Sequence, residues 1–342
     1  MKVSVASYQA VSILHGGPNT QIRGTMKSMA KHGIEVTFFD PWKAFKKQDC
    51  DLFHLFAANI GTYHLAREIH SLGIPMVVSP IIYGNHSHSF VRRSLAFSEI
   101  LGKLGRGLWS DYGITAEICS WAKKALPNTQ AEADLLHKGL GVSKSKILVV
   151  PNGVDERFAN GDRSLFKKKY GLDNFILNVG HIGHQRKNVL ALINALGQID
   201  HPAVIIGRII KGEYGDACVR EAGKYKHILL IDGLDNSSEL LASAYAACDV
   251  FVLPSMFETP GIAALEAALA GAKIVITPYG GTREYFQNMA TYVEPDSVKS
   301  IRDGITKALN EPRTSLLGDH IQREYLWTRI AEKTAQVYRE VL

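Results

Sequence analysis

The chain has 342 residues, of which 46% are hydrophobic and 21% are charged. This composition is typical of a soluble globular protein with two domains and excludes a disordered chain. The four cysteines form no C-x-x-C pair, which argues against a zinc site or a disulfide framework and favours a reducing compartment. No run of about 18 apolar residues predicts a spanning helix, and the N-terminus is typical of a first strand rather than a signal peptide. We therefore expect a cytoplasmic protein.

The positive charge is unevenly distributed along the chain. Residues 1–155 contain 17 Lys and Arg against 11 Asp and Glu, whereas residues 156–342 contain 22 of each, so the net charge of +6 belongs to the first part. Such asymmetry indicates an anionic partner, which could be nucleic acid, a membrane surface or a phosphorylated acceptor. An ordinary basic surface would have the same composition.

Short β-branched and apolar runs alternate with amphipathic segments through the first half. We expect strands at 3–7, 35–39, 52–56, 76–79 and 147–150, and helices at 22–32, 61–72 and 131–139.

The second half repeats this alternation. We expect strands at 175–179, 204–206, 228–231, 250–253 and 274–277, and helices at 189–196, 238–247, 262–270, 298–309 and 321–342. Near-continuous apolar strands alternating with helices are typical of parallel sheets covered on both faces. The chain is therefore predicted to be α/β, with two doubly wound, Rossmann-like domains.

The join between the domains is expected near the Asn152-Gly153 turn signal, where a predicted strand ends. We assign residues 1–152 to the first domain and 153–325 to the second. Residues 326–342 are expected to form a C-terminal helix that packs back on the first domain.

The segment after the strand at 250–253 has the features of an anion site. Thr259 followed by Pro260 predicts a helix start, with Thr259 as the N-cap and Pro260 as the first helical residue. The amides near Gly261 and Ile262 would then lie at the carboxyl end of a parallel strand. Open α/β sheets bind ligands there, and a helix N-terminus favours a phosphate.

Two acidic residues accompany this helix. Glu258 precedes it, and a carboxylate there would repel a phosphate unless it contacts another group, such as a sugar hydroxyl. Glu266 lies about 40° around the helix from Ile262, beside the apolar stripe. A carboxylate at the edge of a buried face needs hydrogen-bond donors. Ribose hydroxyls would serve, and so would a neighbouring Lys or Arg.

These residues resemble a known family. Glu258 and Glu266 match the E-x7-E pattern of retaining glycosyltransferases of family 4, within a DVFVLPS strand at 249–255 and an LEA-x-x-A-G helix at 265–271. The resemblance implies the GT-B fold. It also implies that Glu266 binds the ribose of the donor nucleotide and Glu258 the donor sugar. The amides near Gly261 and Ile262 would face the diphosphate, and Thr259 and Pro260 would belong to the same donor site.

A basic loop follows the strand at 175–179. Gly180 and His181 come first, and Arg186 and Lys187 follow just before the next helix. The loop is similar to the family's G-R…K-[GN] segment, in which cations would stabilise the departing diphosphate. Lys187 matches the family's lysine, but His181 occupies the arginine position. Either Arg186 or a protonated His181 could supply the missing cation. Without the resemblance, this is an ordinary basic loop at a helix start.

Further glycines follow other predicted strands. The resemblance places Gly16 and Gly17 beside the donor diphosphate, with Arg23 as a lesser candidate. It places Gly207, Gly233 and Leu234 around the nucleobase. The Asp232-Gly233 pair alone indicates only a turn. The histidine that many members carry after the strand at 76–79 has no clear match in His86 or His88.

Residues 89–109 mix aromatic and aliphatic side chains with four cations. This pattern suits a helix at a membrane interface, and it also suits a core helix with a basic outer face. The partners expected are a nucleotide-sugar donor, a glycan or lipid-linked acceptor and peripheral membrane contact, without nucleic acid.

The resemblance implies transfer of a sugar from a UDP- or GDP-sugar to an acceptor hydroxyl with retention, in surface polysaccharide or glycan synthesis. No metal motif is evident, and no cofactor is expected. Two alternatives stay open at this point. One is a sugar-nucleotide epimerase of the same fold, and the other is an inactive sugar-nucleotide-binding subunit, which the His181 substitution would suit.

Overall fold

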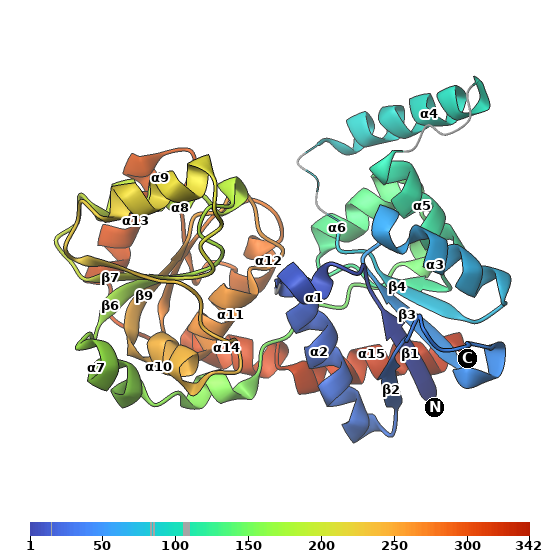
Figure 1. Cartoon of the computed structure of the whole chain (residues 1–342), viewed down its shortest axis with the longest axis horizontal. Coiled ribbons are helices and arrows are strands. Elements are labelled where there is room, and N and C mark those ends of the chain that lie inside the picture. Colours follow the sequence, from blue (N-terminus) through green and yellow to red (C-terminus); the bar gives the residue numbers. More distant parts are fainter. Residues whose placement is uncertain (15, 83, 85, 105–109) are drawn as a thin grey trace. The chain divides into compact units, whose positions relative to one another are not determined.

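The computed structural model describes residues 1–14, 16–82, 84, 86–104 and 110–342, with the backbone alone at residues 14 and 98–104 (Figure 1). The chain forms two compact units. Unit 1 comprises Met1–Gly153 and Trp327–Leu342, and unit 2 comprises Val154–Leu326. Each boundary lies one residue beyond the one expected from the sequence. Among the described residues, every helix is too short or too polar to cross a membrane.

Unit 1 contains a five-stranded parallel sheet in the order β2-β1-β3-β4-β5. Its strands are β1 Lys2–Ala6, β2 Glu35–Phe38, β3 Leu52–Phe56, β4 Met76–Ser79 and β5 Lys124–Ala125. Its helices are α1 Val11–Leu14, α2 Gly17–Met29, α3 Ile60–Ser71, α4 His88–Leu104, α5 Asp111–Trp121, α6 Gln130–Asp134 and α15 Trp327–Val341. Every residue of β3 is buried, as expected for an inner strand of a doubly covered sheet.

The connection from β2 to β3 has only a short 3₁₀ turn, Lys47–Asp49, in place of a crossover helix. Phe39 and Phe45 pack their rings edge-on against Phe53 of β3, with their centroids 5.8 and 6.2 Å from that of Phe53. Aromatic side chains thus cover the part of the sheet that a helix would otherwise cover.

The C-terminal helix α15 belongs to unit 1, where it lies beside α2 (Figure 1). The indole of Trp327 packs against Gly24 and Gly153, where a β-carbon would come within 2.3 and 2.6 Å of its ring atoms. Farther along the helix, the hydroxyl of Tyr338 is 2.6 Å from Nδ1 of His54 in β3. Two glycines and one buried hydrogen bond therefore fix this helix on unit 1.

Unit 2 contains a six-stranded parallel sheet in the order β11-β10-β9-β6-β7-β8. Its strands are β6 Phe175–Val179, β7 Ala203–Ile206, β8 Ile228–Ile231, β9 Cys248–Leu253, β10 Lys273–Ile276 and β11 Thr291–Tyr292. Its helices are α7 Arg163–Tyr170, α8 Val189–Leu196, α9 Glu213–Ala222, α10 Glu239–Ala247, α11 Ile262–Leu269, α12 Thr282–Phe286, α13 Val298–Asn310 and α14 Leu316–Glu324. Two parallel-sheet, Rossmann-like units confirm the predicted fold class.

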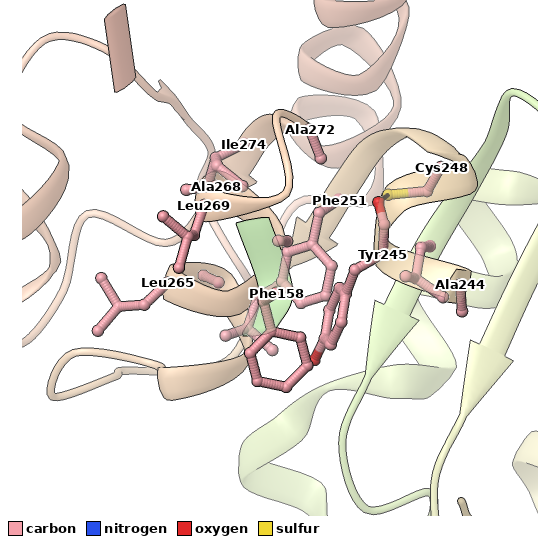
Figure 2. Close-up of a cluster of buried hydrophobic side chains, with 14 of the residues drawn as sticks. Phe158, Ala244, Tyr245, Cys248, Phe251, Leu265, Ala268, Leu269, Ala272 and Ile274 are labelled. Carbon is pink, nitrogen blue, oxygen red and sulfur yellow. Dashed lines mark hydrogen bonds between the residues drawn. The ribbon is translucent and has the colours of Figure 1, made fainter. Parts of the chain in front are cut away.

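One core cluster of unit 2 supports the functional site described below. Figure 2 shows the ring of Tyr245 in α10 beside those of Phe158 and Phe251, whose centroids are 5.4 and 5.9 Å away. Leu265 and Leu269 of α11 belong to the same buried cluster. This apolar packing holds α10 and α11 firmly against the sheet.

Two of the expected elements differ most from the structure. The strand predicted at 147–150 is wrong, because only Ile147 forms an isolated bridge, to Ala125, and Pro127 offers no backbone N–H to extend the pairing. The single helix predicted at 321–342 is two helices. Leu326, between them, is bridged to Val154, so the backbone there leaves the helical path.

Candidate functional site

Four loops of unit 2 follow the carboxyl ends of adjacent strands. They begin after β6, β7, β8 and β9 and carry most of the residues singled out from the sequence. Backbone hydrogen bonds join the first three. Gly180 donates to the carbonyl of Ile206 at 2.9 Å, and Gly207 donates to that of Ile231 at 3.0 Å. These loops therefore lie side by side at the sheet edge where open α/β folds bind ligands.

The helix start expected at Thr259 and Pro260 is wrong. α11 begins at Ile262, and its N-cap is Gly261, which makes no side-chain cap. The φ of Gly261 is +84°, outside the right-handed helical region, so the helix cannot extend back to Pro260. The amides that open α11 nevertheless lack acceptors within the helix and lie after β9, as the anion site requires.

Glu258 is held in place by its backbone. Its N–H donates to the carbonyl of Tyr279 at 3.1 Å, and its own carbonyl accepts from Gly281 at 2.8 Å. Gly280, with φ +90°, lies so close that a β-carbon would come within 2.1 Å of the Glu258 carbonyl oxygen. No pattern in the sequence indicates this support from the loop after β10.

The carboxylate of Glu258 is buried beside two cations. Nζ of Lys187 lies 2.5 Å from Oε1 of Glu258, and Nη1 of Arg186 lies 3.3 Å from the same oxygen. Burial opposes ionisation of Glu258, but the two cations outweigh it and lower its pKa. Burial also lowers the pKa of Lys187, and the neighbouring carboxylate opposes that effect. The sequence placed all three residues in the site but did not predict that they form an ion cluster.

The turn that carries the cations is fixed to the loop of Glu258. Met256 donates its N–H to the carbonyl of Arg186 at 2.8 Å, and Nη1 of Arg186 donates to the carbonyl of Phe257 at 2.9 Å. Asn188 donates its side-chain amide to the carbonyl of Pro254 at 3.0 Å. Arg186 thus has a backbone-anchoring role in addition to its charge.

His181 lies half-buried after β6. Burial lowers its pKa, and the nearby cations Lys187, His184, Arg208 and Arg186 lower it further. The imidazole is therefore neutral at pH 7, and the protonated His181 considered from the sequence is disfavoured. Arg186 is the cation that lies beside Lys187 and Glu258.

Glu266 is buried in α11 and accepts two hydrogen bonds from neutral donors. The Tyr245 hydroxyl lies 2.7 Å from Oε2, and the Asn236 amide nitrogen lies 3.0 Å from Oε1. Burial raises the pKa of Glu266 to about 6, although both hydrogen bonds act to lower it. The lysine or arginine partner considered from the sequence is not what holds this carboxylate, and sequence reasoning missed both of its donors.

The structural reason for glycine differs from one position of these loops to the next. At Gly207, a β-carbon would come within 1.7 Å of the carbonyl oxygen of Gly180, so backbone packing requires glycine. At Gly180, a β-carbon would meet only the methylenes of Lys187, at 3.8 Å or more, among the described residues. Gly233 has φ +75°, and Leu234 packs on the core. Of these, Gly180 is the one that leaves space beside Lys187.

The remaining candidate site residues belong to unit 1 and precede these loops in the sequence. Gly16 is the N-cap of α2 and Gly17 its first residue, and Arg23 donates to the side chain of Asn19 at 2.9 Å. His86 packs on Phe90, with ring centroids 4.7 Å apart, and His88 begins α4. The side chains of residues 98–109, in the segment proposed for membrane contact, lie outside the described part.

Comparisons with known proteins identify the family of the chain. The family described as glycosyl transferases group 1 matches residues 162–324, and glycosyltransferase family 4 matches residues 39–158. An uncharacterized glycosyltransferase of Methanocaldococcus jannaschii is 29% identical over an alignment of 216 residues that covers 57% of this chain and 54% of that protein. The matches to the first curated relatives extend over only about half of those proteins' length.

Solved structures show the fold. The sucrose-phosphate synthase of Thermosynechococcus elongatus has a TM-score of 0.75 at 17% identity and covers 99% of this chain and 98% of its own. The HepE protein of Anabaena, solved in complex with UDP and glucose, has a TM-score of 0.72 at 17% identity, with 99% of both chains covered. The chain belongs to the glycosyltransferases of group 1 and family 4, and it has the GT-B fold.

Proposed function

We propose that the protein transfers a sugar from a UDP- or GDP-sugar to an acceptor hydroxyl with retention of configuration. The observation that carries the proposal is the ion cluster of Lys187 and Arg186 with Glu258, which lies in the loop that leads from the carboxyl end of β9 to the opening amides of α11. Cations and helix amides together suit a nucleoside diphosphate, whose negative charge grows as the glycosidic bond breaks.

In this proposal, Lys187 stabilises the departing diphosphate and Arg186 supplies the charge that His181 cannot. Glu258 receives a hydroxyl of the donor sugar, and Glu266 receives the ribose hydroxyls. Neither carboxylate suits the role of a covalent nucleophile, because one is neutralised by two cations and the other holds two donors. We therefore propose displacement on the face of the sugar from which the diphosphate leaves. No metal ion and no cofactor enter the proposal.

Nucleotide affinity tests the donor half of the proposal. We expect UDP or GDP to bind the wild-type protein in a calorimetric titration. Glu266→Gln should weaken binding by roughly tenfold or more, because it removes the charge that strengthens hydrogen bonds to the ribose. Exposed Glu311→Gln is the matched control in the same unit and should bind like the wild type. Equal affinity in both variants would remove Glu266 from the donor site.

We extend the proposal to an acceptor that is a glycan or a lipid-linked glycan, and to a peripheral membrane contact through residues 89–109. In the described part of α4, Phe90 and Phe97 are 53% and 63% exposed, and Arg92 and Arg93 are exposed beside them. Exposed aromatic rings among cations suit an anionic lipid interface. Sedimentation with vesicles tests this: Phe90→Ser with Phe97→Ser should lose binding to anionic vesicles, and equal binding would refute the contact.

A further inference from the structure

Asn236 lies in the loop between β8 and α10, where the nucleobase is expected, and its side chain reaches across to the carboxylate of Glu266. The amide nitrogen donates to Oε1 at 3.0 Å, over a separation of 30 residues. Tyr245 donates to the other oxygen, Oε2. Among the described residues, each carboxylate oxygen accepts from one of these two donors and retains capacity for one further hydroxyl.

The backbone on both sides of Asn236 is fixed independently. Arg157, at the start of unit 2, donates to the carbonyls of Asn236 and Ser238, the latter at 3.4 Å. Ser237, directly after Asn236, donates its N–H to the side chain of Asp235, directly before it, at 2.7 Å, and Ser238 caps α10 by accepting from Leu240. The loop therefore presents the Asn236 amide to Glu266 from a restrained backbone rather than from a loose one.

We propose that Asn236 is a positioning residue that holds the Glu266 carboxylate in the orientation that receives the ribose hydroxyls of the donor and ties it to the nucleobase loop. This inference rests on the proposed function. It joins the base-side loop to the ribose carboxylate through the Asn236 amide, so that loss of this amide is felt at Glu266.

The charged and titratable groups around Glu266 give a pH signature for this role. They are Tyr245 from α10 and Arg157 and Asp155 from the segment that opens unit 2. The pKa of Glu266 is raised to about 6 by burial, and the Asn236 hydrogen bond acts to lower it. Loss of that hydrogen bond would raise the pKa further. Since the carboxylate form is the better acceptor, nucleotide affinity should fall as the pH drops through the pKa.

Calorimetric titration of UDP and of GDP into the full-length protein between pH 5 and pH 8 tests the role of Asn236. We expect wild-type affinity to decline below about pH 6. Asn236→Ala should bind roughly tenfold more weakly at pH 7.5, as expected for one hydrogen bond to a charged group, and its decline should begin at higher pH. Ser237→Ala, which changes the same loop without touching Glu266, is the matched control and should follow the wild type.

The outcomes distinguish the positioning role of Asn236 from the proposed donor site. If Asn236→Ala and Ser237→Ala have the same affinity and the same pH midpoint, the positioning role is refuted while the donor site stands. If Asn236→Ala weakens binding without moving the midpoint, Asn236 supports the loop alone and the link to Glu266 is refuted. If the wild-type protein binds neither UDP nor GDP, the proposed function fails and the inference fails with it.

Discussion

Replacement of Lys187 by Met tests whether the buried ion cluster is an energetic unit. The side chains of Lys187 and Glu258 are 18% and 7% exposed, and their charged atoms are 2.5 Å apart. Lys187→Met keeps the length of the side chain but leaves the carboxylate short of a cation. Breaking a buried pair from one side costs about 3 to 5 kcal/mol. Arg186, 3.3 Å from the same oxygen, remains, so we expect a loss near 3 kcal/mol, the lower end of that range.

A second substitution shows whether the lost stability comes from the unpaired carboxylate or from disrupted packing. Glu258→Gln in the Lys187→Met background removes the uncompensated carboxylate. The double variant should therefore recover most of the lost stability and lie within about 1 kcal/mol of the wild type. Exposed Lys224, which pairs with Glu221 on α9, is the matched control, and Lys224→Met should cause no measurable change.

The distribution of tryptophan makes the assay specific to one unit. All four tryptophans, Trp42, Trp109, Trp121 and Trp327, belong to unit 1. In urea unfolding, tryptophan emission therefore reports unit 1, whereas far-ultraviolet circular dichroism reports both units. The part of the circular dichroism change that is not accompanied by a change in emission reports unit 2. Lys187→Met should lower the urea midpoint of that part. An unchanged urea midpoint for unit 2 in Lys187→Met would refute the ion cluster as an energetic unit. So would a double variant whose loss of unfolding free energy equals the sum of the two single losses.

Other predictions concern the glycines and a buried histidine. Gly207→Ala should unfold unit 2 at lower urea, because its β-carbon would come within 1.7 Å of the Gly180 carbonyl oxygen, whereas Gly180→Ala should keep stability and lose nucleotide affinity in a calorimetric titration. Comparable stability of the two variants would contradict this. Burial lowers the pKa of His54 to about 3. Its folded pKa is below the ordinary 6.5, so the unfolded chain takes up the proton first, and stability is lost as the pH falls from 6.5 towards 3. The loss is about 1.4 kcal/mol per pH unit. Tryptophan-monitored unfolding should show this slope in the wild type and a flatter one in His54→Gln, and equal slopes would refute it.

The sequence predicted the sheet strands well because buried parallel strands carry a continuous local signal. Several strands, including β3, β6 and β8, have the expected bounds. The errors arose where tertiary structure overrides a local pattern. Thr259-Pro260 has the form of a helix start, but the left-handed backbone of Gly261 delays the helix to Ile262. In the same way, the helical pattern at 321–342 does not reveal that Leu326 bridges to Val154.

The residue types of the candidate site could be predicted from the sequence, but the contacts between their side chains could not. The spacing of Glu258 and Glu266 and the position of Lys187 were visible in the sequence. The donors to Glu266 were not, because Tyr245 and Asn236 lie 21 and 30 residues away and reach it only once α10 and the loop after β8 are packed. Nor does a local pattern indicate that Lys187 and Glu258, 71 residues apart, share one buried ion pair.

Release of nucleotide from a sugar donor without acceptor tests the central claim most directly. The protein is incubated with UDP-sugars and GDP-sugars, and the products are separated. We predict slow release of UDP or GDP from one donor, and its loss in Lys187→Met, because the cation that stabilises the departing diphosphate is gone. A nucleotide-sugar with a changed sugar would indicate an epimerase instead. Binding without any release would indicate an inactive subunit, and either result would contradict the proposed transferase.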